Sequence, residues 1–270
     1  MPEFISTREG RRLFGLNPEG YADVRPDYPD EIYAFLHAHH ALVPNTATLE
    51  IGAGSGLATR RLIERGANPI TVIEPDSRFA PLLQGLSKTS DAEVRLIQNA
   101  FEDADLASAS FDLVAAATSF HWLDPSVAIG KIAAVLRPGG YAALWWNVFG
   151  DLEREDPFHE ATRSLLADLA ISPSGAPDAI PFALDRRARE AEFARSGKFE
   201  AVAYAQTRWT LVLDAAQVGR LYESFSHIQR LPKAQRLVLL KQLMDVARTQ
   251  FSGRVERNMT SPIYLFRRKA

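Results

Sequence analysis

The sequence has 270 residues, of which 46% are hydrophobic and 24% are charged, enough for one large α/β domain or two small ones. Lys plus Arg number 31 and Asp plus Glu 33, a net charge of −2, which excludes a general attraction for nucleic acid or anionic membranes. We interpret the basic run at residues 186–189 as a solvated helix face. Without cysteine, the chain has no disulfide, thiolate nucleophile or cysteine-ligated zinc. Because no signal peptide or membrane-spanning run is evident, we expect a cytoplasmic protein.

Residues 1–45 have a helical and irregular pattern, with a helix expected from about Asp30 to His40. The next hundred residues alternate short apolar runs with helical stretches, the most evident of which are 57–65 and 126–137. The predicted strands are 48–51, 70–74, 94–97, 111–115 and 141–146. Continuously apolar strands separated by helices are typical of a doubly wound, mostly parallel, Rossmann-like sheet.

The second half of the chain has a different pattern. Residues 151–198 carry helical stretches, a Pro- and Gly-containing loop and no strand signal, and we interpret them as a helical cap inserted at the carboxyl edge of the sheet. A strand pattern returns near residues 201–213, and a long helix is expected at about 232–250. A last strand is expected at 262–266, so residues 199–270 complete the sheet.

A glycine-rich turn follows the first predicted strand, with Gly52, Gly54 and Gly56 at alternate positions. Glycines let the backbone approach a ligand, and the amides of the following helix can hold an anion. Glu50 precedes the turn and Glu74 ends the second strand, where a carboxylate can accept both hydroxyls of a ribose. The turn therefore predicts a nucleoside-containing cofactor.

Two cofactor classes fit such a turn. A nicotinamide dinucleotide site prefers G-x-G-x-x-G/A, but Leu57 occupies the last position here, and Glu50 would repel a pyrophosphate. The ammonium and sulfonium groups of S-adenosylmethionine favour a nearby carboxylate. The residues therefore favour S-adenosylmethionine, with an NAD(P)-dependent oxidoreductase as the alternative.

Four patterns occur in order: E-x-G-x-G-x-G at 50–56, an acidic residue ending the second strand, F-D-L-V at 111–114 and L-R-P-G-G at 136–140. In this order they resemble the class I S-adenosylmethionine-dependent methyltransferases, which have a seven-stranded sheet. The segments at 21–29 and 117–124 resemble Y-x-x-x-R-P-x-Y-P and A-x-x-F-H-W-x-D of the small-molecule branch, which includes trans-aconitate and ubiquinone/menaquinone methyltransferases. The resemblance is close over about residues 10–148.

We divide the chain into four parts: an N-terminal helical segment (1–45) closing over the cofactor, a cofactor-binding core (46–150), the cap (151–198) and the C-terminal strands and helices (199–270). The resemblance concerns mainly the first two. It also implies which residues bind S-adenosylmethionine. They are Tyr21, Arg25, Tyr28, Glu50, Gly52, Ala53, Gly54, Gly56, Glu74, Pro75, Asp76, Asn99, Ala100, Phe101, Glu102, Thr118, Ser119 and Phe120.

His121 follows the fourth strand, where the transferred methyl group should lie, and is either a general base or part of a wall around the acceptor. Trp122, Trp146 and Asn147 are the other candidate acceptor-binding residues, whereas Trp145 should point the opposite way, into packing. No metal site is expected, because the histidines at 37, 39 and 40 lack a supporting carboxylate pattern.

The sequence thus predicts methyl transfer from S-adenosylmethionine to a small-molecule acceptor, with S-adenosylhomocysteine as the product. A carboxylate acceptor is favoured, because it needs no base and no unambiguous base is present. A non-catalytic S-adenosylmethionine-binding protein is a further alternative. No nucleic-acid partner is expected, and the sequence does not indicate an oligomeric state.

Overall fold

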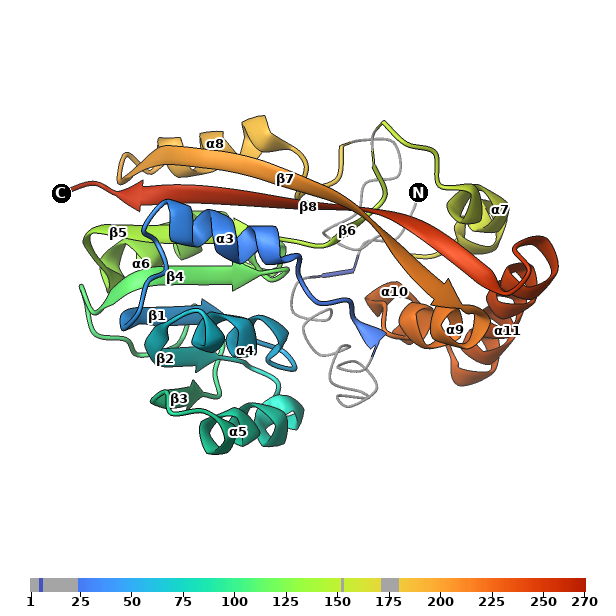
Figure 1. Cartoon of the computed structure of the whole chain (residues 1–270), viewed down its shortest axis with the longest axis horizontal. Coiled ribbons are helices and arrows are strands. Elements are labelled where there is room, and N and C mark those ends of the chain that lie inside the picture. The colour runs from blue at the N-terminus through green and yellow to red at the C-terminus, as the bar shows by residue number, and fades with distance from the viewer. Residues whose placement is uncertain (1–4, 7–23, 152, 171–179) are drawn as a thin grey trace. The chain divides into compact units, whose positions relative to one another are not determined.

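The predicted strands of residues 46–147 lie side by side in one mostly parallel sheet (Figure 1). The computed structural model describes residues 5–6, 24–151, 153–170 and 180–270. The chain forms two units, which are described separately. The first comprises Met1–Pro26, Asn147–Ala179 and Arg208–Thr260, and the second comprises Asp27–Trp146, Ile180–Thr207 and Ser261–Ala270.

The sheet has the strand order β3-β2-β1-β4-β5-β8-β6, and β7 pairs with β8. The pairs among β1 to β5 are parallel, whereas β8 runs antiparallel to β5 and β6. The strands are β1 Thr46–Ile51, β2 Ala67–Ile73, β3 Val94–Ile97, β4 Phe111–Ala117, β5 Leu136–Trp145, β6 Val148–Phe149, β7 Phe199–Asp214 and β8 Arg254–Arg268. The predicted doubly wound, mostly parallel fold is confirmed, with the two-residue β6 as an additional strand.

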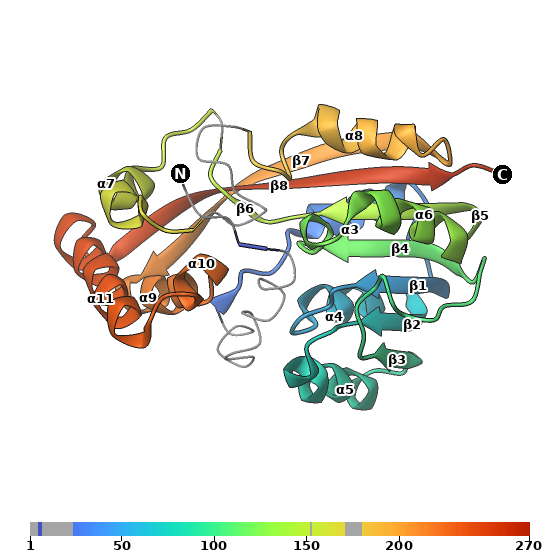
Figure 2. The same cartoon turned by 180° about the vertical axis from the view of Figure 1, so that it is seen from behind.

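The helices of the second unit cover both faces of its sheet. Helices α3 and α4 lie on the face toward the viewer in Figure 1, and α6 lies on the face toward the viewer in Figure 2. The helices of this unit are α3 Asp30–Ala38, α4 Leu57–Glu64, η2 Ser77–Phe79, α5 Ala80–Thr89, η3 Phe120–Trp122, α6 Pro125–Val135 and α8 Arg186–Arg195. Because both faces are covered, β1 is buried along its whole length, including Thr46, Thr48 and Glu50.

The strand order changes direction at β1, because β2 and β3 lie on one side of it and β4 and β5 on the other. β1 and β4 are neighbours and pair in parallel. In a doubly wound sheet, the crevice outside the carboxyl ends of two such strands is the usual ligand site. The glycine turn follows β1 here, and η3 follows β4. The topology therefore brings these two segments together.

The first unit has a helical core. Its helices are α7 Pro157–Leu166, α9 Ala215–Glu223, α10 Ser226–Gln229 and α11 Lys233–Gln250. Apolar side chains of α7, α9 and α11, among them Phe158, Val218 and Leu243, form a buried cluster. Within this unit, the buried Arg257 of β8 links Asp156 to Tyr222 of α9. Its Nε donates to Asp156 Oδ2 (2.7 Å) and its Nη1 to the Tyr222 hydroxyl (2.6 Å).

The largest differences from the predicted strand boundaries are the starts of β5 and β8. β5 begins at Leu136, so Pro138-Gly139-Gly140 lies within the strand as an irregularity between the pairs Phe111–Leu136 and Leu113–Tyr141, not in a turn before it. β8 begins at Arg254, eight residues before the predicted start, because the charged Arg257 occupies a buried position and hides the alternating pattern.

Candidate cofactor and acceptor site

The glycine turn after β1 is held to the end of β2 by its backbone. The amides of Gly52 and Ala53 donate to the Ile73 carbonyl at 2.8 and 3.2 Å. Gly52 has a φ of +70°, and a Cβ there would lie 2.7 Å from the Cβ of Ser119. Gly54 has a φ of +55°, and apart from its chain neighbours no described residue lies within 4 Å of the position of its Cβ. Gly52 is therefore required for packing, whereas Gly54 leaves open space beside the turn.

Glu74 faces the glycine turn from the carboxyl end of β2. Its Oε2 accepts the Gly54 amide at 2.8 Å, and its Oε1 accepts the Asp76 amide at 2.9 Å. The side chain is buried. These two bonds orient the carboxylate beside the open space at Gly54, where the resemblance places a ribose.

Glu50 is a buried carboxyl group, with only 1% of its surface exposed. Burial raises its pKa to about 8; the Thr59 hydroxyl opposes this shift and the charge of Glu74 adds to it. Among the residues that the structure describes, none forms a hydrogen bond with Glu50 Oε2. A buried polar atom without a partner is costly, so this oxygen fits the ammonium group of a bound ligand.

The N-terminus of α4 supplies the remaining part of a zwitterion site. Gly56 is the N-cap with a φ of +84°, and no side chain within the described part of the chain caps this end. Uncapped first-turn amides can hold a carboxylate. Together with Glu50, they match the carboxylate and ammonium of a methionine moiety, and Glu74 matches the ribose. The residues present therefore fit S-adenosylmethionine.

The segment after β4 packs directly against the turn. Ser119 Oγ donates to the Ile51 carbonyl at 2.5 Å, at the end of β1. Thr118 has a φ of +51°, an unusual conformation for a β-branched residue, and its amide donates to the Trp145 carbonyl at 2.7 Å. Such strained residues often occur at functional sites. The predicted cofactor residues Thr118 and Ser119 thus adjoin the glycine turn.

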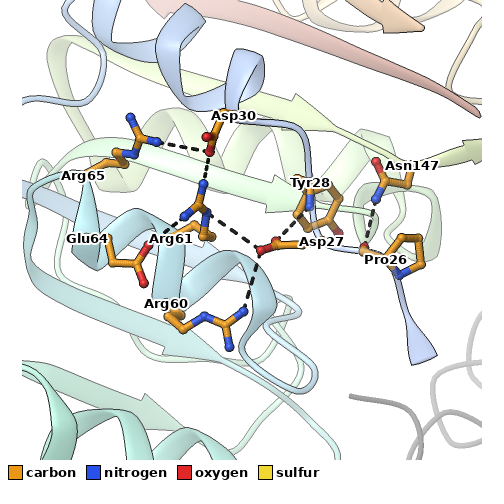
Figure 3. A network of polar contacts seen from close by, with 9 residues as sticks. All are labelled: Pro26, Asp27, Tyr28, Asp30, Arg60, Arg61, Glu64, Arg65 and Asn147. Carbon is orange, nitrogen blue, oxygen red and sulfur yellow. Dashed lines mark hydrogen bonds and ion pairs between the residues drawn. The ribbon is translucent and has the colours of Figure 1, made fainter. Parts of the chain in front are cut away.

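Tyr28 contacts both the segment after β4 and the end of β5. The Tyr28 hydroxyl donates to Thr118 Oγ1 at 2.9 Å, and its ring packs edge-on against Trp145 with 6.0 Å between centroids. An ion-pair network fastens the residues around Tyr28 to α4 (Figure 3). It consists of Asp27 with Arg60 (3.7 Å) and Arg61 (3.8 Å), Asp30 with Arg61 and with Arg65 (3.1 Å), and Arg61 with Glu64 (2.9 Å).

His121 and Trp146 form a buried wall beyond Ser119. Trp146 Nε1 donates to His121 Nδ1 at 3.0 Å. The His121 ring lies 4.9 Å from that of Trp122. Trp145 contacts Tyr28 and Tyr33, whereas Trp146 contacts Phe182 and Tyr264, so the two tryptophans point in opposite directions as expected.

Three residues that sequence reasoning missed complete this wall. The Phe182 ring lies 6.0 Å from both His121 and Trp146, and Tyr264 lies 6.0 Å from Trp146. Arg189 Cζ lies 3.4 Å from the Phe182 ring centroid, and its Nη1 donates to the Phe182 carbonyl at 2.9 Å. Our interpretation of residues 186–189 as a solvated face was wrong for Arg189, which is only 5% exposed. Its charge is paired with Glu192 at 2.5 Å.

Several predicted cofactor residues have local partners. Asp76 caps η2 through the Arg78 amide (3.1 Å) and pairs with the Arg78 side chain (2.6 Å). Exposed Asn99 accepts the neighbouring Ala100 amide at 2.9 Å. Phe101 is buried, with Lys131 Nζ 5.4 Å from its ring. The remaining ones are exposed Pro75, half-buried Ala100 and Glu102, and buried Ala53 and Phe120.

Two predicted site residues lie in the first unit. Arg25 Nη2 donates to the Ser224 carbonyl at 3.0 Å, and its guanidinium lies 4.7 Å from the Phe225 ring centroid. Asn147 Nδ2 donates to the Pro26 carbonyl at 3.0 Å (Figure 3). Tyr21 lies outside the described residues.

Comparison with known proteins agrees with this geometry. Residues 49–144 match the family described as "Methyltransferase domain". This region therefore resembles a methyltransferase domain. It contains the glycine turn, Glu74 and His121, all of which belong to the second unit.

Relatives of the methyltransferase domain occur in bacteria and fungi. An uncharacterized methyltransferase of Mycobacterium tuberculosis is 37% identical over 53% of this chain and 55% of its own length, so the chain spans about half of that relative. One of Schizosaccharomyces pombe is 28% identical over 94% of this chain and 96% of its own length. Among solved structures, phosphoethanolamine N-methyltransferase 2 of Haemonchus contortus, bound to S-adenosylhomocysteine, covers 100% of this chain and 62% of its own with a TM-score of 0.58. At 13% identity that likeness concerns the fold.

The described residues contain neither a metal-binding cluster nor a membrane-spanning helix. No group of three or more histidine, cysteine, aspartate or glutamate side chains in that part of the chain could hold a metal ion. Within the same residues, no helix is long and apolar enough to cross a membrane.

Proposed function

We propose that this protein transfers a methyl group from S-adenosylmethionine to a small-molecule acceptor. The observation that carries the proposal is Glu50, a buried carboxyl group whose Oε2 has no hydrogen-bond partner among the described residues. An ammonium group would donate to this oxygen and favour its ionised form, whereas a dinucleotide pyrophosphate has no donor to offer it. The match of residues 49–144 to a methyltransferase domain supports the same cofactor.

The residues of the chain act mainly by binding and alignment. Bound S-adenosylmethionine supplies a methyl group already attached to a sulfonium leaving group. Glu50 and the first-turn amides of α4 would hold the methionine end, and Glu74 would hold the ribose. The buried His121 and Trp146 would keep water from the reacting atoms.

A small, ionised acceptor such as a carboxylate fits these residues best. A net charge of −2 gives no general attraction for nucleic acid. A carboxylate reacts without losing a proton, and His121 Nδ1 already accepts a hydrogen bond from Trp146. Residues 151–198 are divided between the two units, and Phe182 from this segment contacts the wall, which supports a role for the segment in acceptor selection.

The test is a methylation assay over a panel of metabolites, with S-adenosylhomocysteine as the readout, after calorimetry with S-adenosylmethionine and with NAD(H) and NADP(H). We expect S-adenosylmethionine binding and turnover of a carboxylic acid. Dinucleotide binding without S-adenosylmethionine binding would indicate an oxidoreductase. Cofactor binding without turnover on any acceptor would indicate a non-catalytic binding protein.

A further inference from the structure

The hydrogen bond between Trp146 and His121 determines which His121 nitrogen carries a proton. An indole N–H can only donate, so Nδ1, 3.0 Å from Trp146 Nε1, must be the unprotonated acceptor. Neutral His121 therefore carries its proton on Nε2. The two side chains are 6% and 2% exposed, so water competes little for this bond.

Contacts from distant segments hold the Trp146 ring in place. The Trp146 amide donates to the Pro262 carbonyl at 3.3 Å, which fixes the backbone beside β8. Tyr264 packs against the indole at an interplanar angle of 85° and Phe182 at 63°. Arg189 stacks on Phe182 and donates to its carbonyl. The indole N–H is thus oriented toward His121 by packing on two sides.

His121 lies close to the segment that contacts the cofactor turn. It is the central residue of η3, whose N-cap residue is Ser119. Ser119 contacts the end of β1 through Oγ and lies against Gly52. Because only Phe120 separates Ser119 from His121, the Trp146–His121 pair lies at the same edge of the sheet as the turn contact.

We propose that Trp146 is a positioning residue that holds His121 in the Nε2–H form, so that His121 orients an ionised acceptor as a hydrogen-bond donor and does not act as a base. The inference rests on the proposed function. It defines the substrate class as acceptors whose nucleophilic oxygen is ionised before transfer, as in carboxylic acids.

The proposed step balances without a proton acceptor. A lone pair of the carboxylate oxygen forms the new C–O bond as the methyl–sulfur bond breaks. The electron pair of the methyl–sulfur bond stays on sulfur. The anion and the sulfonium become a neutral ester and a neutral thioether. A hydroxyl acceptor would have to release a proton, but Nε2 already carries one and protonating Nδ1 would break the bond to Trp146.

The first test is ¹⁵N NMR of the protein labelled at histidine, recorded without cofactor or acceptor. The His121 signals are identified by their loss in His121→Gln. We expect a protonated Nε2 and an unprotonated Nδ1 at neutral pH in the wild type, and a mixture of both tautomers in Trp146→Phe. A protonated Nδ1 in the wild type would overturn the proposal.

Trp145→Phe is the matched control for that variant. Trp145 is as deeply buried as its neighbour, but its Nε1 forms no hydrogen bond with any described residue. Its replacement removes an indole of the same size without removing a donor to His121. We expect the His121 spectrum of Trp145→Phe to match that of the wild type. An equal change in both variants would show that packing, and not the N–H donor, sets the tautomer.

The second test compares carboxylic acids with their alcohol analogues as acceptors. We expect turnover of acids only, and a kcat in Trp146→Phe lowered by about tenfold with little change in KM for S-adenosylmethionine. Turnover of alcohols alone, dependent on His121, would overturn the donor role. No turnover of any acceptor would overturn the donor role and the proposed function together, while the NMR spectra would still decide the tautomer.

Discussion

The turn after β1 and the wall after β4 lie at the same edge of the sheet but are built differently. The turn side uses backbone amides and two carboxyl groups within residues 50–74, and its geometry follows from three glycines and two strand ends. The wall uses large side chains from segments far apart in the chain, including His121, Trp146 and Phe182. A common cofactor can be bound by a local motif, whereas an acceptor site requires side chains that only the folded chain brings together.

The largest expected effect concerns the turn. Gly54→Val places a branched side chain in the open space beside Glu74, at a positive φ, and should weaken S-adenosylmethionine binding by about 100-fold or more in calorimetry. Gly197→Val is the matched control, because Gly197 also has a positive φ (+68°) and open space around its Cβ position. Similar affinity losses in both variants would show a general backbone effect and remove the turn from the cofactor site.

The next effect tests the carboxyl group that precedes the turn. The pKa of Glu50 in the empty protein is raised to about 8, and an ammonium ligand favours its ionised form, so binding releases a proton. Affinity for S-adenosylmethionine should therefore fall by up to about tenfold per pH unit as pH drops below 8.

Glu50→Gln should remove that pH dependence, because glutamine does not titrate. The amine of the cofactor titrates equally in both proteins, so the difference between them isolates Glu50. Glu93→Gln, a change of an exposed carboxylate, is the control and should keep the wild-type slope. The same slope in Glu50→Gln would mean that Glu50 does not contact the ammonium group.

A smaller effect is expected at the wall. Phe182→Leu keeps an apolar side chain but removes the ring that contacts His121 and Trp146, so KM for the acceptor should rise severalfold. Affinity for S-adenosylmethionine measured by calorimetry should stay within about twofold, since the turn is unchanged. A larger loss of cofactor affinity than of acceptor affinity would contradict the separation of the two sides.

The smallest effect is expected for the ion pairs between Asp30 and α4. Asp30→Asn removes its pairs with Arg61 and Arg65, which are partly exposed and worth at most about 1 kcal/mol each. S-adenosylmethionine affinity should fall by about two- to threefold at low salt, and the difference should shrink at high salt. Glu160→Gln, which breaks the exposed pair with Arg163 in α7, serves as the control. A salt-independent loss in Asp30→Asn would indicate a structural role instead.

Much of the fold was predictable, because buried parallel strands have continuously apolar sequences. β3 has the predicted bounds, and α4 begins at the predicted Leu57. The start of β8 was missed because Arg257 is buried and paired with Asp156, a long-range contact that local hydrophobicity cannot reveal. Phe182 was missed because its contacts with His121 and Trp146 are also long-range. Arg189 was missed because an arginine-rich helix ordinarily faces solvent.

The sequence by itself was enough to predict the proposed methyl-donor side of this protein. Glu50, Gly54 and Glu74 lie within one strand-turn-helix-strand unit, and their chemistry follows from residue type and spacing. Only the tertiary structure decided the environment of His121, because its protonation depends on an indole twenty-five positions along the chain, and on Phe182 and Tyr264 packing against that indole. Hydrogen-bond partners between distant segments are set by packing, so this part of the site appears only in the folded chain.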